Sequence, residues 1–213
     1  MTADWTDELE GDAPDVVAAW RGIEEGRFIS VRREIRRRAG AGSAVGALAQ
    51  LEATAAALIS LVEALPEAAF AMPGGESDWT VAEAIGHDAA ARSGIVLAAS
   101  LAAGGRWPAD APTVVPSIPG DAAADRAQLV RKIAQSQRIV VRAARAVIGR
   151  ETDPCPLEHP LVGRLRCGEW LLFAGVHDVM HLEQLHGIAD SFGADRGAGA
   201  APMAQPSPDG PVG

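Results

Sequence analysis

Hydrophobic side chains recur at helical spacing along four long segments of the chain. Within residues 44–65 the apolar positions fall three or four residues apart, as in Leu51, Ala55, Leu58 and Val62. Runs of β-branched or aromatic residues are few, which favours helix over strand. The pattern predicts an all-α protein built on a four-helix bundle, with helices over residues 44–65, 80–103, 121–149 and 168–191.

Proline and glycine mark the connections between these helices. Pro66 ends the first helix, and a capping box formed by Thr80 and Glu83 begins the second. Residues 104–120 contain four prolines and predict a long loop, which allows a crossover instead of plain up-down topology. Residues 150–165 also carry several prolines and are predicted as a second loop.

Both ends of the chain differ from this pattern. Residues 1–15 are acidic and are predicted to be poorly ordered, whereas residues 16–39 predict an extra N-terminal helix. That helix ends in a run of arginines, which indicates a solvated helix face or, alternatively, a contact with an acidic partner: Arg32, Arg33, Arg36, Arg37 and Arg38. The chain is therefore divided into an N-terminal extension, the bundle, and a disordered tail rich in glycine, alanine and proline: 1–43, 44–192 and 193–213.

Composition excludes several kinds of chemistry. The 213 residues include no tyrosine and a single lysine, Lys132, so a phenolic acid or base is absent and a P-loop or Schiff-base enzyme is not expected. The net charge of −9 does not favour nucleic-acid binding. The acidic start lacks the basic region of a signal peptide, and Gln50, Glu52 and Glu63 interrupt the most apolar segment. We therefore expect a cytoplasmic protein without a membrane span.

Histidine is the remaining candidate for chemistry. His177 and His181 are four residues apart, which separates them by only ~40° around a helix, so that both could hold one ion. They follow the apolar residues 170–176, where unsatisfied imidazoles would be costly. His87, in the second predicted helix, is the candidate third ligand. Three imidazoles suit Zn²⁺, Ni²⁺ or Fe²⁺ and leave an open position, although on spacing alone three unrelated histidines are an equal alternative.

Three nearby residues are candidate cofactor-binding residues. Gln184 lies seven residues after His177, ~20° off the same face, where it could orient a ligand histidine or bind a metal-bound water. Trp79 and Trp170 flank the two histidine segments. We expect both rings to pack in the core near the site, with a wall against a bound cofactor as the alternative.

Cysteine offers a weaker rival site. Cys155 and His159, together with Cys167, could form a second metal site, but the second ligand pair of a zinc ribbon is missing. His159 is therefore interpreted as a loop residue. His186 lies ~180° around the helix from His177 and is predicted to face solvent.

Three segments carry a resemblance to a known family. Residues 77–87, SDWTVAEAIGH, are similar to the opening of the family's second helix, and residues 159–165, HPLVGRL, to a loop motif. Residues 169–185 are similar to its HxxxHxxQ helix. In this order and spacing the segments resemble the DinB superfamily of four-helix proteins, over roughly residues 44–190.

The resemblance implies a DinB-like bundle, frequent homodimers, and a metal held by three histidines: His87, His177 and His181. Arg166 departs from the family pattern, because a serine or threonine often stands there and would cap the fourth helix. Similar members include bacillithiol and mycothiol S-transferases, mycothiol-dependent maleylpyruvate isomerase, and YfiT-like metal hydrolases.

Two metal-dependent reactions follow from that resemblance: thiol transfer and water activation. Hydrolysis usually uses a carboxylate base, but Asp178 and Glu183 lie ~100–120° from the ligand face, and Asp88, next to His87, has the same difficulty. We therefore expect transfer of a low-molecular-weight thiol to an electrophilic small molecule. Mycothiol is favoured because the abundant alanine and arginine are typical of GC-rich genomes. A hydrolase, or a non-catalytic bundle that binds a small molecule or a protein, is the alternative.

Overall fold

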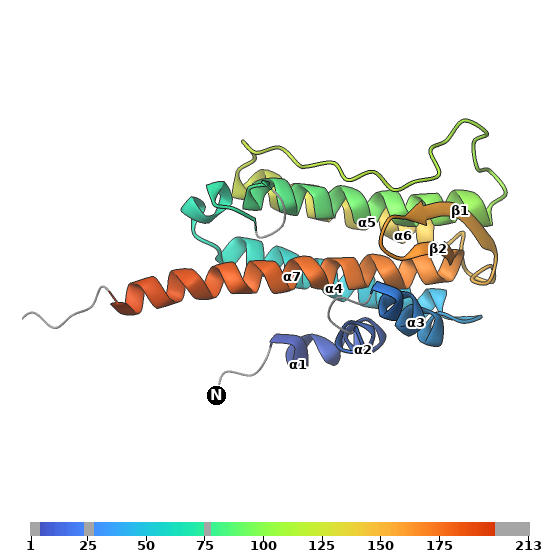
Figure 1. Ribbon diagram of the computed structural model, residues 1–213, viewed down its shortest axis with the longest axis horizontal. Helices are drawn as coiled ribbons and strands as arrows, with labels where there is room; N and C mark the ends of the chain where they lie inside the picture. Colours follow the sequence, from blue (N-terminus) through green and yellow to red (C-terminus); the bar gives the residue numbers. More distant parts are fainter. Residues whose placement is uncertain (1–4, 24–27, 75–77, 199–213) are drawn as a thin grey trace, which may run out of the picture.

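Four long helices form a bundle (Figure 1) in the computed structural model, which describes residues 5–23, 28–74 and 78–198. They are α4 (Ala44–Ala64), α5 (Val81–Ala103), α6 (Arg126–Ala144) and α7 (Cys167–Ala198). Helices α4 and α5 each pack against both α6 and α7, so α4 and α5 occupy opposite corners of the bundle. Side chains such as Leu58, Ile85 and Ile133 fill its core. The predicted all-α four-helix bundle is confirmed.

The connection between α5 and α6 returns along the length of the bundle. Residues 104–125 leave the end of α5 and come back to the end where α5 begins, so α5 and α6 run parallel (Figure 1). This path is the crossover that residues 104–120 allowed. On the way, Val115 N donates a hydrogen bond to Glu158 O at 2.9 Å, which ties the connection to the segment before α7.

Residues 150–165, predicted as a loop, instead contain an antiparallel hairpin. Its strands are β1 (Pro154–His159) and β2 (Gly163–Arg166), and Gly163 has a φ of 69° at the turn. Alternate side chains of β1 are buried, including Cys155 and Leu157. The prolines of this strand fall at its exposed positions, which a two-stranded sheet tolerates. The loop prediction was wrong because the alternation of buried and exposed residues in β1 favours a strand despite its two prolines.

The N-terminal extension holds three short helices instead of one. They are α1 (Trp5–Glu10), α2 (Pro14–Arg21) and α3 (Phe28–Arg38), and a 3-10 helix, η1 (Glu67–Ala71), follows α4. The prediction of poor order over residues 1–15 is therefore wrong for the described part, residues 5–15. Pro14 begins α2, where its missing N–H costs nothing, and Arg21 forms ion pairs with Asp7 and Glu10 of α1.

A buried glutamine on α4 holds the extension against the bundle. The Gln50 side-chain oxygen accepts hydrogen bonds from Asp15 N at 2.8 Å and Val16 N at 2.9 Å, so it caps the first turn of α2. Helix α2 also packs closely on α7, because a Cβ on Gly175 would lie 2.7 Å from Val16 Cγ2. The acidic N-terminal residues are therefore ordered by contacts with α4 and α7, which lie far along the chain.

The arginine run of α3 surrounds a buried carboxylate. Glu34 forms ion pairs with Arg38 at 2.7 Å and Arg33 at 3.0 Å, and also with Arg37. Hydrogen bonds from Arg38 and Arg33 lower the pKa of Glu34 to about 2. Three arginines of the run therefore pair with a glutamate of their own helix. A contact between the run and an acidic partner stays a prediction.

Helix α4 is long and apolar enough to cross a membrane by length and composition. In this fold it is a core helix, because it packs on α6 and α7 and buries Leu51, Leu58 and Val62 completely. Helix α7 extends to Ala198, beyond the predicted end at residue 191, and residues 199–213 of the predicted tail lie outside the described residues.

Candidate metal centre

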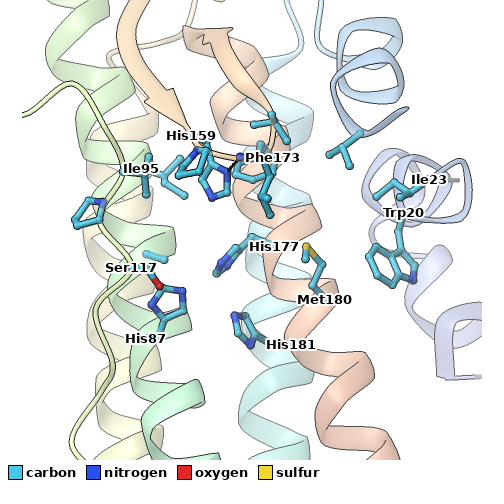
Figure 2. Close-up of a pocket in the computed structure, with 17 residues that line it drawn as sticks. Trp20, Ile23, His87, Ile95, Ser117, His159, Phe173, His177, Met180 and His181 are labelled. Atoms are coloured by element: carbon cyan, nitrogen blue, oxygen red, sulfur yellow. Dashed lines mark hydrogen bonds between the residues drawn. The ribbon is translucent and has the colours of Figure 1, made fainter. Parts of the chain in front are cut away.

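Three histidines from two helices converge at one side of the bundle. His87 comes from α5, and His177 and His181 come from consecutive turns of α7 (Figure 2). One ring nitrogen from each lies within 4.8 Å of the others. The ring centroids of His177 and His181 are 4.7 Å apart, and those of His87 and His177 are 5.4 Å apart. The structure thus brings together the three residues suggested as metal ligands.

Each of these imidazoles is oriented through its Nδ1 atom. His177 Nδ1 lies 3.1 Å from Asp88 Oδ1, and His181 Nδ1 lies 2.9 Å from Gln184 Oε1. His87 Nδ1 lies 2.9 Å from the carbonyl oxygen of Ile118. Because all three partners are acceptors, each Nδ1 donates its proton and each Nε2 carries the lone pair. This is the tautomer that an Nε2-coordinated metal requires.

Buried charge beside the triad also suits a cation. Asp88, Arg92 and Asp178 are completely buried, and Arg92 pairs with Asp178 while Asp88 contacts His177. Burial alone would raise the pKa of Asp88, but the hydrogen bond from His177 and nearby positive charge lower it to about 2. Asp88 Oδ2 is buried without a hydrogen-bond partner in the described part of the chain. The residues present therefore fit a divalent cation, and burial lowers the pKa of His181 to about 4, which keeps that ligand neutral.

Arg92 anchors the buried carboxylate of Asp178. Its Nε lies 3.1 Å from Asp178, which also accepts a hydrogen bond from the Thr54 hydroxyl. Its terminal nitrogens donate to Leu51 O at 2.7 Å and Ser136 Oγ at 3.2 Å. All four helices of the bundle therefore contribute to the contacts of Arg92. These contacts hold Asp178, and with it the turn of α7 that carries His177.

A close contact between two glycines places the backbone acceptor of His87. A Cβ on Gly86 would lie 2.8 Å from Gly120 Cα, and Gly120 N donates to Glu83 O at 2.9 Å. The 104–125 connection therefore touches α5 beside His87, and the carbonyl of Ile118 is held at the imidazole.

We expect Gly86→Ala to be destabilising even though alanine favours helix. The new methyl group would meet backbone that cannot move aside, so the variant should be less stable than Gly94→Ala by about 1–3 kcal/mol. Gly94 is the matched control, because a Cβ there meets nothing within 4 Å on the same helix. Urea denaturation of both variants measures the difference, and equal stabilities would contradict the importance of the glycine contact.

A cavity of about 380 Å³ opens beside the triad. Apart from the three histidines and His159, its described walls are mostly apolar and come from the extension, α5, the crossover, the hairpin and α7 (Figure 2). They include Trp20, Ile23, Ile95, Val115, Phe173 and Met180.

His159, interpreted from sequence as a loop residue, lines this cavity at the end of β1. Its ring packs edge-on against Phe173, with centroids 5.1 Å apart. Leu161 N donates to His159 Nδ1 at 3.1 Å, so the proton lies on Nε2, the opposite tautomer to that of the triad. Burial, together with the charges of His177 and His87, lowers the pKa of His159 to about 4. His159 is therefore a neutral imidazole with an N–H to donate.

The candidate cofactor-binding residues lie behind the cavity wall. Gln184 orients His181, which is the first of its two expected roles. Trp79 packs against His87 with ring centroids 4.9 Å apart, and Trp170 is fully buried against Phe173 at 5.6 Å. Neither indole is among the residues that line the cavity. Trp170 thus supports the site from the core, as expected, whereas Trp79 is only half-buried and lies outside the hydrophobic core of the described residues.

Other sequence interpretations change with the structure. His186 was predicted to face solvent but is half-buried and stacks on Trp5, with centroids 4.7 Å apart. Cys155 and Cys167 are buried free thiols, and neither lines the cavity. Arg166 lacks a capping hydroxyl, yet Glu169 still accepts a hydrogen bond from Arg166 N at 2.7 Å, so half of the capping box is present.

Comparisons with known proteins agree with this arrangement. Searches of curated proteins and of solved structures gave no significant match. The family profile described as the DinB superfamily matches residues 50–185, which contain α5, the hairpin and all three histidines of the triad. With the bundle and its candidate metal centre both in place, the chain belongs to the DinB superfamily.

Proposed function

We propose that the chain is a cytoplasmic, metal-dependent enzyme that transfers a low-molecular-weight thiol such as mycothiol to an electrophilic small molecule. The observation that carries this proposal is the convergence of three oriented imidazoles, one ring nitrogen from each within 4.8 Å of the others, beside a cavity. His87, His177 and His181 would hold Zn²⁺, Ni²⁺ or Fe²⁺. When bound, the ion supplies a Lewis acid that favours the ionised form of a thiol.

The cavity walls support an external nucleophile. Among the described residues, those lining the cavity include neither a cysteine nor a carboxylate. Asp88 is engaged with His177, and Asp178 with Arg92, so neither is placed as a general base for water. A thiol brought by a second substrate removes the need for both groups, which favours thiol transfer over hydrolysis.

The chain's own residues would bind and orient the reactants. Asp88, Gln184 and the Ile118 carbonyl fix the three imidazoles, and His159 offers Nε2–H to an acceptor on the electrophile. In the transfer, a sulfur–carbon bond forms, the leaving group departs with its electron pair, and the thiol proton goes to solvent. The homodimer that the family resemblance implies stays a prediction.

Conjugation of a fluorogenic electrophile tests this function. Zinc-loaded protein, mycothiol and monobromobimane should yield the bimane thioether and bromide about tenfold faster than the uncatalysed mixture, an effect that needs only ~1.4 kcal/mol of transition-state stabilisation. Chelation should abolish the acceleration and zinc should restore it. An unchanged rate with mycothiol and with other small thiols would contradict thiol transfer, and thiol-independent cleavage of an ester would favour the hydrolase instead.

A further inference from the structure

The far end of the cavity is built by residues outside the DinB match. Trp20 of α2, Ile23 just after it, and Val31 of α3 all line the cavity, whereas the family match begins at residue 50. In Figure 2 the cavity extends from His87 to Trp20 and Ile23, and Met180 lies on the side of α7 that faces Trp20. The N-terminal extension therefore completes a site whose chemical centre belongs to the bundle.

The position of this wall is fixed by buried contacts. Val16 and Val17 of α2 have no exposed surface, and Gln50 bonds to the first turn of the same helix. Gly175, two residues before His177, allows α2 to approach α7 at the Val16 side chain. Because Trp20 lies one turn beyond Val16, the docking of α2 determines where the indole lies.

The chemistry of this end differs from that of the histidine end. The walls around it include Trp20, Ile23, Val31 and Met180, and none of these side chains carries a charge. A cavity of about 380 Å³ holds a small molecule, not a peptide.

We propose that the N-terminal extension forms an apolar subsite that selects apolar small molecules, with Trp20 as the residue that determines specificity. The inference rests on the proposed function only in taking this cavity as the substrate site. The apolar part of an electrophile would lie against Trp20 while its reacting group lies at the histidines.

Binding of N-phenyl-1-naphthylamine, an uncharged fluorescent probe, tests the subsite in the full-length chain. Trp20→Ala removes an apolar wall and is expected to raise the Kd of the probe about tenfold. Trp20→Phe keeps an aromatic wall and should restore most of the affinity, which separates loss of the wall from loss of the fold. Trp5→Ala is the matched control, because Trp5 lies in the same extension but stacks on His186.

Each outcome of this experiment decides the proposal. A wild-type Kd for Trp20→Ala, equal losses for Trp20→Ala and Trp5→Ala, or no binding of the probe to the wild-type chain would overturn it. Zinc content, measured on the same samples, is expected to be unchanged by Trp20→Ala. If the chain holds no zinc but the probe behaves as expected, the proposed function fails while the apolar subsite stands.

Discussion

Replacing His177 with alanine is expected to remove the bound metal. The wild-type chain should bind about one zinc ion, whereas the variant retains two imidazoles and loses the ligand that Asp88 orients. Loss of a supporting residue alone costs 10–100-fold in metal affinity, so loss of the ligand should cost more than about 100-fold. Competition with a chromophoric chelator measures the affinity.

The control for this variant lies on the same helix. His186→Ala removes an imidazole that stacks on Trp5 instead of facing His87, and it should leave zinc affinity within about twofold. Far-UV circular dichroism of the two variants should be alike. The metal centre would be contradicted if His177→Ala bound zinc as tightly as His186→Ala, or if the wild-type chain bound none.

Arg92→Met should strongly destabilise the bundle core. The guanidinium is completely buried and makes polar contacts with four residues: Asp178, Leu51 O, Ser136 Oγ and Gln137 Oε1. Without it, Asp178 would lose its ion-pair partner while buried within 4.8 Å of Asp88. Breaking such a pair costs about 3–5 kcal/mol, which urea denaturation would measure.

A double variant separates the charge effect from the packing effect. Arg92→Met with Asp178→Leu removes both charges, so it should recover much of the loss, as replacement of buried ion pairs by apolar side chains often does. Arg131→Met is the surface control on α6 and should change stability by no more than about 0.5 kcal/mol, because Arg131 is exposed. If Arg92→Met were as mild as Arg131→Met, the ion pair would not be a source of stability.

The sequence predicted the parts of the fold that depend on local periodicity. The apolar positions of α4 and α7 recur at helical spacing, and the interval between His177 and His181 places both on one face. The N-terminal helices could not be predicted in the same way, because α2 is capped by Gln50, which lies on another helix. Long-range contacts of this kind leave no periodic pattern.

The supporting residues of the site show a similar division. On a single helix Asp88 points away from the ligand face, which argues against a general base but conceals its contact with His177 on α7. Arg92 lies four residues later in the same apolar helix, and it was the available signal for a buried polar cluster. A buried cation needs a buried anion as its partner. The tautomer of His159 depends on a backbone N–H of the hairpin turn and has no sequence signature.

The backbone acceptor at His87 has an evolutionary consequence. Point mutation changes side chains but leaves every carbonyl in place, so substitution at Ile118 leaves the acceptor of His87 chemically intact. The neighbouring Val115 and Ser117 line the cavity and are free to diversify toward new substrates without rebuilding the metal ligand set. Intolerance to mutation is concentrated instead at Gly86 and Gly120, where the crossover touches α5. The residues that line the cavity could therefore change during evolution, and the substrates with them, while the residues that hold the metal stay the same.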